Sequence, residues 1–130
     1  MLTSQERINK NERTKKYNKK RRQTDMNFRI LGSLRSRIRL SLKGKTKSKY
    51  TLELIGCSIE FLKQWLENKF IEGMNWNNYG FGKNKWNIDH IKPCSKFDLT
   101  DIEQQKQCFH YSNLQQLWHI DNLKKNNKYD

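Results

Sequence analysis

Residues 86–93 read WNIDHIKP, and the rest of the expected fold can be built outward from this stretch. Trp86 and Ile88 alternate with polar residues, and this period of two predicts a β-strand. Pro93 ends the pattern, because proline lacks the backbone donor that a paired strand needs. Asp89 and His90 therefore lie where the strand ends. On a regular strand they point to opposite faces, so both can serve one site only if the backbone bends there.

Two later segments can complete a strand–strand–helix unit with this strand. Residues 113–117 (NLQQL) read as a short strand or turn, and residues 121–128 are compatible with a short last helix. Before the first of these segments, Thr100 and Glu103 have the spacing of a capping box, which predicts a helix over about 101–109. Such a unit would gather an acid, an imidazole and two amides around one ion: Asp89, His90, Asn113 and Asn122.

The upstream residues predict helices joined by polar segments. Apolar residues spaced three or four apart predict a helix over 27–43, with Gly44 ending it, followed by a basic loop. Its apolar face comprises Leu31, Leu34, Ile38 and Leu42. The apolar run 50–57 fits either a helix or a strand. Ser58 is suited to cap a helix over 59–70. Residues 73–86 are rich in Gly and Asn, which indicates turns.

The charge is concentrated at one end of the chain. The net charge is +14, from 27 Lys and Arg against 13 Asp and Glu. Residues 1–49 hold 17 of these basic residues and three acidic ones, whereas residues 50–130 are balanced. This polarity predicts a polyanionic partner, with nucleic acid the first choice. We read residues 1–25 as a flexible or conditionally helical arm that contacts nucleic acid; the alternative is a solvated tail. Arg35, Arg37 and Arg39 fit phosphate binding and simple solvation equally well.

Composition argues against several other classes of protein. No apolar stretch is long enough to span a membrane, and the first residues do not resemble a secretory signal. Cys57, Cys94 and Cys108 cannot form a complete disulfide framework, so we expect an intracellular, reducing compartment. A metal cluster of the two later cysteines with His110 and His119 is disfavoured, because their spacing is not compact.

The acid, imidazole and amides suit hydrolysis of a phosphodiester. Histidine can take a proton from water near neutral pH, and a hard divalent cation can neutralise the leaving oxygen. Asp and Asn oxygens are ligands that Mg²⁺ and Mn²⁺ accept.

Three blocks of the sequence, in order, resemble the HNH endonuclease family in its His-Asn-Asn form. They are WNIDHIKP (86–93), YSNLQQLW (111–118) and DNLKK (121–125). The segments GMNWNNYG (73–80) and FDLTDIEQQKQCF (97–109) also resemble a subgroup common in phages and large DNA viruses. The resemblance covers roughly residues 55–128.

The resemblance implies a role for each matched residue. His90 would be the general base, and Asp89 and Asn122 the protein ligands of one divalent metal, Mg²⁺ before Mn²⁺. Asn113 would position the loop that carries the histidine and orient its imidazole, and Lys125 would meet substrate phosphate. Many relatives hold a structural zinc with two CxxC pairs, which are absent here. We therefore expect no structural zinc, and a finger braced instead by apolar packing of Trp86, Phe97, Leu114, Leu117 and Trp118.

The expected protein is of the α+β class and cleaves double-stranded DNA as a monomer or weak homodimer. Residues 1–25 would form the basic arm, 26–72 a helical DNA-contacting region that includes the three arginines, and 73–130 a ββα-metal (HNH) finger. The main alternative is a non-catalytic nucleic-acid-binding protein that retains an inactive HNH scaffold. A ribosome-associated or RNA-binding basic protein is a third interpretation, supported by charge alone.

Overall fold

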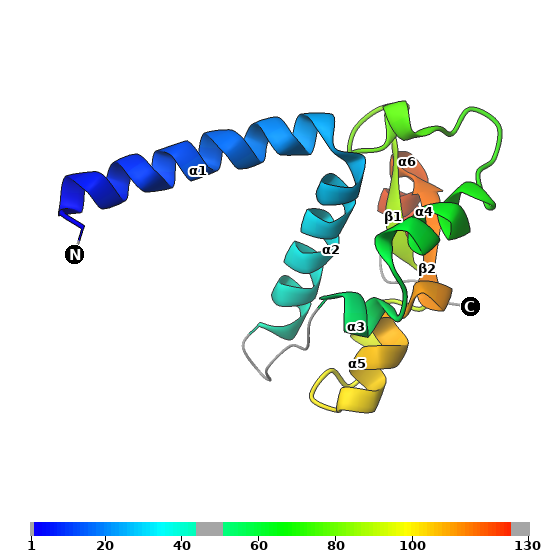
Figure 1. Ribbon diagram of the computed structural model, residues 1–130. Coiled ribbons are helices and arrows are strands. Elements are labelled where there is room, and N and C mark those ends of the chain that lie inside the picture. Colours follow the sequence, from blue (N-terminus) through cyan, green and yellow to red (C-terminus); the bar gives the residue numbers. More distant parts are fainter. Residues whose placement is uncertain (1, 44–50, 126–130) are drawn as a thin grey trace.

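A computed structural model describes residues 2–43 and 51–125, and within these ranges the chain is a mixed α+β protein (Figure 1). Helices surround one small sheet of two antiparallel strands. The longer elements are α1 (Ser4–Thr24), α2 (Met26–Leu42), α3 (Thr51–Ile55), α4 (Ile59–Glu67), β1 (Trp86–His90), α5 (Ile102–Phe109), β2 (Leu114–Trp118) and α6 (His119–Lys125). Three short 3-10 turns are η1 (Trp76–Asn78), η2 (Cys94–Lys96) and η3 (Tyr111–Asn113). The α+β class expected from the sequence is confirmed.

The two strands pair over their full length. Trp86 lies opposite Trp118 at one end of the ladder, and His90 lies opposite Leu114 at the other. The chain passes from β2 directly into α6, and the backbone N–H of His119 donates to the carbonyl of Lys85 at 2.8 Å. This bond ties the start of α6 to the start of β1, so that α6 contacts both strands.

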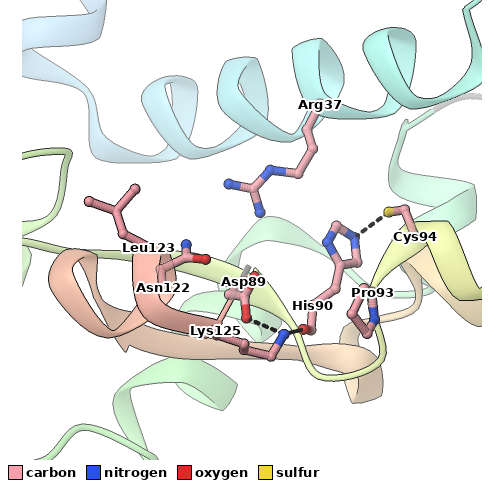
Figure 2. Close-up of a pocket in the computed structure, with 8 residues that line it drawn as sticks. All are labelled: Arg37, Asp89, His90, Pro93, Cys94, Asn122, Leu123 and Lys125. Carbon is pink, nitrogen blue, oxygen red and sulfur yellow. Dashed lines mark hydrogen bonds and ion pairs between the residues drawn. The ribbon is translucent and has the colours of Figure 1, made fainter. Parts of the chain in front are cut away.

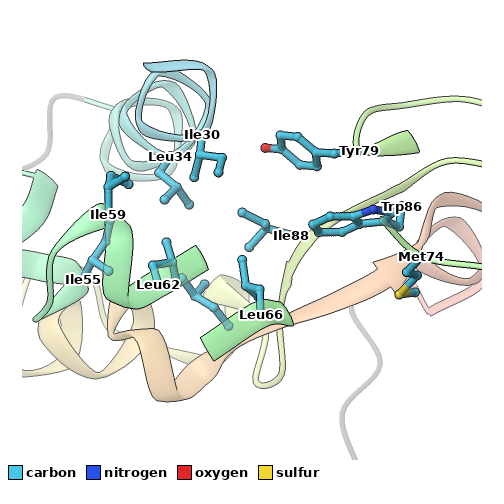
Figure 3. Close-up of a cluster of buried hydrophobic side chains, with 11 residues drawn as sticks. Ile30, Leu34, Ile55, Ile59, Leu62, Leu66, Met74, Tyr79, Trp86 and Ile88 are labelled. Atoms are coloured by element: carbon cyan, nitrogen blue, oxygen red, sulfur yellow. The ribbon is translucent and has the colours of Figure 1, made fainter. Parts of the chain in front are cut away.

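The larger of two apolar core clusters lies between the sheet and helices α2 and α4 (Figure 3). The contribution of α2 is Ile30 and Leu34, and that of α4 is Ile59, Leu62 and Leu66. The sheet adds three buried residues, which are Trp86, Ile88 and Leu114. Regions 26–72 and 73–130 therefore share one core, and the sheet is stabilised by helices from the first region.

The predicted apolar face of α2 is largely confirmed. Leu34, Ile38 and Leu42 are buried, but the fourth buried residue is Ile30, and Leu31 is only partly buried. Of the residues expected to brace the finger, Trp86 and Leu114 are buried, Phe97 and Trp118 pack at the edges of the core clusters, and Leu117 is half-buried.

The N-terminal arm forms a long helix. Of the two forms that the sequence allowed, flexible or conditionally helical, the structure has the helical one. Thr3 and Glu6 form a capping box that begins α1, and Asp25 ends α1 and caps α2 by accepting from the backbone N–H of Phe28. Every side chain described in α1 is exposed, and the helix projects away from the rest of the molecule (Figure 1). Within residues 2–43 and 51–125, no helix is both long and apolar enough to cross a membrane.

Several element boundaries differ from the sequence prediction. The N-cap of α5 is Asp101 and not Thr100, whose hydroxyl instead donates to Asp98 at 2.6 Å. Ser58 caps α4 as predicted, but that helix ends at Glu67. The apolar run before it contains the short helix α3, and α6 begins at His119, two residues early. Gly44, the basic loop after it and the expected end of the last helix lie outside the described residues.

Because α2 packs on the sheet, replacing two different leucines of this helix should have different effects on stability. Leu34 is 4% exposed and Leu40 is 69% exposed. Leu34→Ala should lower the free energy of unfolding by about 2–5 kcal/mol, because it removes buried methyl groups and leaves a cavity. Leu40→Ala should change it by less than about 0.5 kcal/mol. Urea denaturation followed by tryptophan fluorescence measures both, and equal losses would contradict this packing.

Candidate active site

An open pocket with a volume of about 360 Å³ lies where β1 ends, between α2 and α6 (Figure 2). Five candidate site residues from the sequence line it together: Arg37, Asp89, His90, Asn122 and Lys125. Both Asp89 and His90 reach the pocket although they are neighbours on β1. The strand stops at His90 and the chain turns before Pro93, so the irregular end that the sequence required is present.

Asp89 is held from two sides. The Lys125 ammonium lies 2.9 Å from its Oδ2 atom and also donates to the backbone carbonyl of His90 at 2.7 Å. The side-chain amide of Gln115, its partner across the ladder, donates to the same Oδ2 at 3.4 Å. Because the Asp89 and Lys125 side chains are only 15% and 20% exposed, their ion pair is better shielded from water than a surface pair. Lys125 thus fixes both the carboxylate and the end of β1.

A chain of hydrogen bonds sets the orientation of the Asn122 amide. Asn87 is 1% exposed, and its Nδ2 donates to the carbonyl of Gly80 and lies 3.0 Å from Nδ1 of His119. Its Oδ1 therefore faces Asn122, whose Nδ2 donates to it at 2.6 Å. The amide oxygen of Asn122 is left facing the pocket, and Figure 2 shows it on the side of Asp89. The two oxygen-bearing side chains expected to hold a metal are thus neighbours.

His90 is 6% exposed and is fixed by contacts on two sides of its ring. Its Nε2 lies 3.7 Å from the sulfur of Cys94, and its ring packs edge to face against Phe109 with centroids 5.7 Å apart. The other ring nitrogen, Nδ1, points toward the part of the pocket where Arg37 lies (Figure 2). The nitrogen available to a molecule in the pocket is therefore Nδ1.

Asn113 lies behind the pocket and clamps the turn that follows His90. Its Oδ1 accepts from the backbone N–H of Lys92 at 2.9 Å, and its Nδ2 donates to the carbonyls of Lys92 and Cys108. The backbone N–H of Ile91 donates to the carbonyl of Asn113 as well. These bonds agree with the expected role of Asn113 in positioning the loop that carries His90. The side chain of Asn113 bonds backbone atoms and not the imidazole, so it does not orient the ring by direct contact.

The three arginines of α2 have different surroundings. Arg37 lines the pocket, and one of its guanidinium nitrogens donates to the carbonyl of Ile88 on β1. Figure 2 shows the guanidinium above Asp89 and His90. Arg35 and Arg39 are exposed and do not line the pocket, because they lie on another side of the helix.

Two cysteines form a thiol pair beside His90. The Cys108 thiol donates to the Cys94 sulfur at 3.0 Å. This hydrogen bond is the main cause that lowers the pKa of Cys94; burial opposes it, and His90 and Ser41 add to it. The same hydrogen bond and burial raise the pKa of Cys108. His110 and His119 lie elsewhere: the first bonds Ser112 and the second belongs to the Asn87 network.

Three residues that contact the site residues were not among the predicted ones: Asn87, Cys94 and Cys108. The four-residue spacing from His90 to Cys94 is compact, but the sequence analysis considered a metal cluster of the two cysteines only with His110 and His119. Nothing in the sequence distinguishes Asn87 from the other asparagines, because its role depends on the strand register and on α6.

The Asn113 clamp predicts a local effect on hydrogen exchange. Asn113→Ala should speed exchange of the Lys92 amide, which loses its acceptor, while the Ile91 amide keeps its backbone acceptor and changes less. The variant should also lose about 1–3 kcal/mol of stability, because buried backbone groups are left unpaired. Ser112→Ala, at an exposed neighbour, is the matched control. Exchange at Lys92 that matches the unmodified protein would contradict the clamp.

Comparison with known proteins finds two similar sequences. The chain is 42% identical over 118 residues to "Uncharacterized protein L426" and 44% identical over 99 residues to "Uncharacterized protein L246", both from Acanthamoeba polyphaga mimivirus. These matches cover 90% and 76% of this chain but 50% and 42% of the two relatives, so the chain spans about half the length of the curated relatives it matches. No protein-family model and no solved structure matches it.

Proposed function

We propose that this protein is a metal-dependent endonuclease that hydrolyses phosphodiester bonds in DNA. The observation that carries the proposal is the convergence of Asp89, His90 and Asn122 on one pocket that also contains two cationic side chains. The succession of β1, β2 and α6 around that pocket, together with the sequence resemblance, supports assigning this unit to a ββα-metal (HNH) finger.

The donor groups fit a hard divalent cation. The Asp89 carboxylate and the inward-facing Asn122 amide oxygen are the oxygen ligands that Mg²⁺ and Mn²⁺ accept, with water and phosphate completing the set. The fit does not rest on residue type alone, because Asn87 holds the Asn122 amide in the orientation that presents its oxygen. A bound Mg²⁺ would supply a Lewis acid that neutralises charge on the leaving oxygen.

His90 is placed to act as the general base. Its Nδ1 faces the pocket, and a neutral imidazole at that position can accept the proton of an attacking water. The Cys94 and Phe109 contacts fix the ring plane, so that little reorientation is needed. Asn113 holds the turn behind it and is a positioning residue.

Arg37 and Lys125 supply positive charge for the substrate phosphate. The guanidinium uses one nitrogen on the Ile88 carbonyl and presents the remainder to the pocket, where its donors match phosphate oxygens. Lys125 is held by Asp89 and the carbonyl of His90 and lines the same pocket, so its ammonium would lie beside a phosphate bound there.

Plasmid nicking tests the catalytic proposal. In Mg²⁺ the protein should nick supercoiled DNA, EDTA should abolish nicking, and His90→Ala should lower the rate by about 10²- to 10⁴-fold because the general base is lost. His110→Ala, which removes a histidine outside the pocket, should nick at close to the unmodified rate.

Two results would contradict it. DNA binding without nicking in Mg²⁺ or Mn²⁺ would favour the non-catalytic binding protein. Nicking that His90→Ala retains in full would point to a contaminating nuclease or to another site.

The exposed basic surface of α1 predicts its own contribution to DNA binding. Lysines on α1 should release counterions from DNA, at about 0.9 units of salt slope per neutralised phosphate. A triple Lys→Gln variant at 15, 16 and 19 should therefore weaken binding and flatten the dependence of log Kd on log salt concentration. The control carries the same change at Lys83, Lys96 and Lys106, outside α1. Equal slopes for the two variants would show that α1 does not contact phosphates.

A further inference from the structure

Beside the pocket, on the side away from Asn122 where Figure 2 shows His90 and Cys94, three side chains of metal-ligating type lie close together. They are His90, Cys94 and Cys108, and their ligand atoms all lie within 4.8 Å of one another. The two sulfurs are 3.0 Å apart, and Nε2 of His90 is 3.7 Å from the Cys94 sulfur. The oxygens of Asp89 and Asn122 are not part of this group.

These separations suit a tetrahedral zinc ion. Zinc lies about 2.3 Å from thiolate sulfur and about 2.0–2.1 Å from imidazole nitrogen, so tetrahedral donors are roughly 3.5–3.8 Å apart. The cluster needs only a small separation of the two sulfurs to reach that geometry. Thiolate ligands favour zinc over Mg²⁺, which prefers oxygen. We propose that His90 Nε2, Cys94 Sγ and Cys108 Sγ bind one Zn²⁺ at a site separate from the Asp89–Asn122 pair.

The surrounding packing holds the three donors in place. His90 ends β1, Cys94 begins η2 and Cys108 lies near the end of α5, so each ligand comes from a different element. Cys108 is fully buried in a second apolar cluster with Ile38, Leu42, Leu54 and Phe109. Cys94 borders the open pocket and leaves a route for the ion and for a water as fourth ligand. Each thiol would lose its proton to solvent on binding.

Zinc at this site would switch off the proposed nuclease, and this consequence rests on the proposed function. A neutral imidazole has one N–H, so metal on Nε2 leaves the proton on Nδ1. That nitrogen faces the pocket and could no longer accept a proton from water. Zinc would therefore inhibit by occupying the far side of the general base, without displacing Mg²⁺.

Cobalt substitution tests the site independently of catalysis. Reduced full-length protein titrated with Co²⁺ should develop a thiolate-to-cobalt charge-transfer band that saturates at one ion per chain and is removed by one Zn²⁺. Cys94→Ser, which keeps Cys108 as its one thiolate, should give a weaker band and bind zinc at least about tenfold more weakly in competition with a chromogenic chelator, since losing even an outer hydrogen-bond partner costs that much. Cys57→Ser is the matched control, because Cys57 lies outside the cluster, and it should behave as the unmodified protein does.

A missing charge-transfer band in the unmodified protein would overturn the proposal, as would a band that Cys94→Ser retains at full intensity. Cys94 is the first variant because it is half-buried, and far-UV circular dichroism checks that it folds. His90→Ala gives a second variant, which should weaken zinc binding while keeping the thiolate band. Stoichiometric zinc should inhibit nicking by the unmodified protein in Mg²⁺, and it should inhibit Cys94→Ser by a smaller factor when each protein is compared with its own zinc-free rate. If no divalent metal supports nicking, the proposed function fails, but the cobalt band still decides the zinc site.

Discussion

The pairing of β1 with β2 brings together residues that lie far apart in the sequence, and every part of the pocket depends on it. The ladder places Asp89 opposite Gln115 and His90 opposite Leu114. Because β2 runs directly into α6, the same register carries Asn122 and Lys125 to the end of β1. Two strands alone are only marginally stable in water, so the ladder needs the apolar core beneath it. Helices α2 and α4 provide that core.

Helix α2, which carries the arginines, contributes to the stability of the fold as well as to its positive charge. Arg29 donates to the carbonyl of Tyr79 at 2.6 Å, and Arg37 donates to the carbonyl of Ile88 on β1. These bonds attach α2 to backbone acceptors beside the sheet, while Ile30 and Leu34 pack beneath. The basic half of the chain therefore forms a wall of the pocket, through Arg37, as well as the surface proposed to bind DNA. Arg35 and Arg39 remain exposed.

Local sequence patterns predicted the features that depend on neighbouring residues alone. The β1 strand, its end near Pro93, the Ser58 cap and most of the buried face of α2 follow from side-chain periodicity and from backbone donors that need partners. The helix cap at Asp101 was misplaced by one residue, because Thr100 and Asp101 both offer suitable oxygens. The gathering of Asp89, His90 and Asn122 in one pocket was expected from the strand–strand–helix unit and from the order of three motif blocks, whereas Lys125 was expected there only through the family resemblance. The Asn87–Asn122 bond and the contact of His90 with two cysteines could not be derived, since they require the register and the docking of η2 and α5.

The proposed role of His90 as general base is tested most directly by chemical rescue. In His90→Gly the pocket keeps the oxygens proposed to bind the metal and gains room for a free imidazole. Nicking in Mg²⁺ should fall to background and return as imidazole is added, while Asn122→Gly, which lacks a proposed metal ligand, should not be rescued. Undiminished nicking by His90→Gly without imidazole would contradict the role assigned to His90 and, with it, the proposed mechanism.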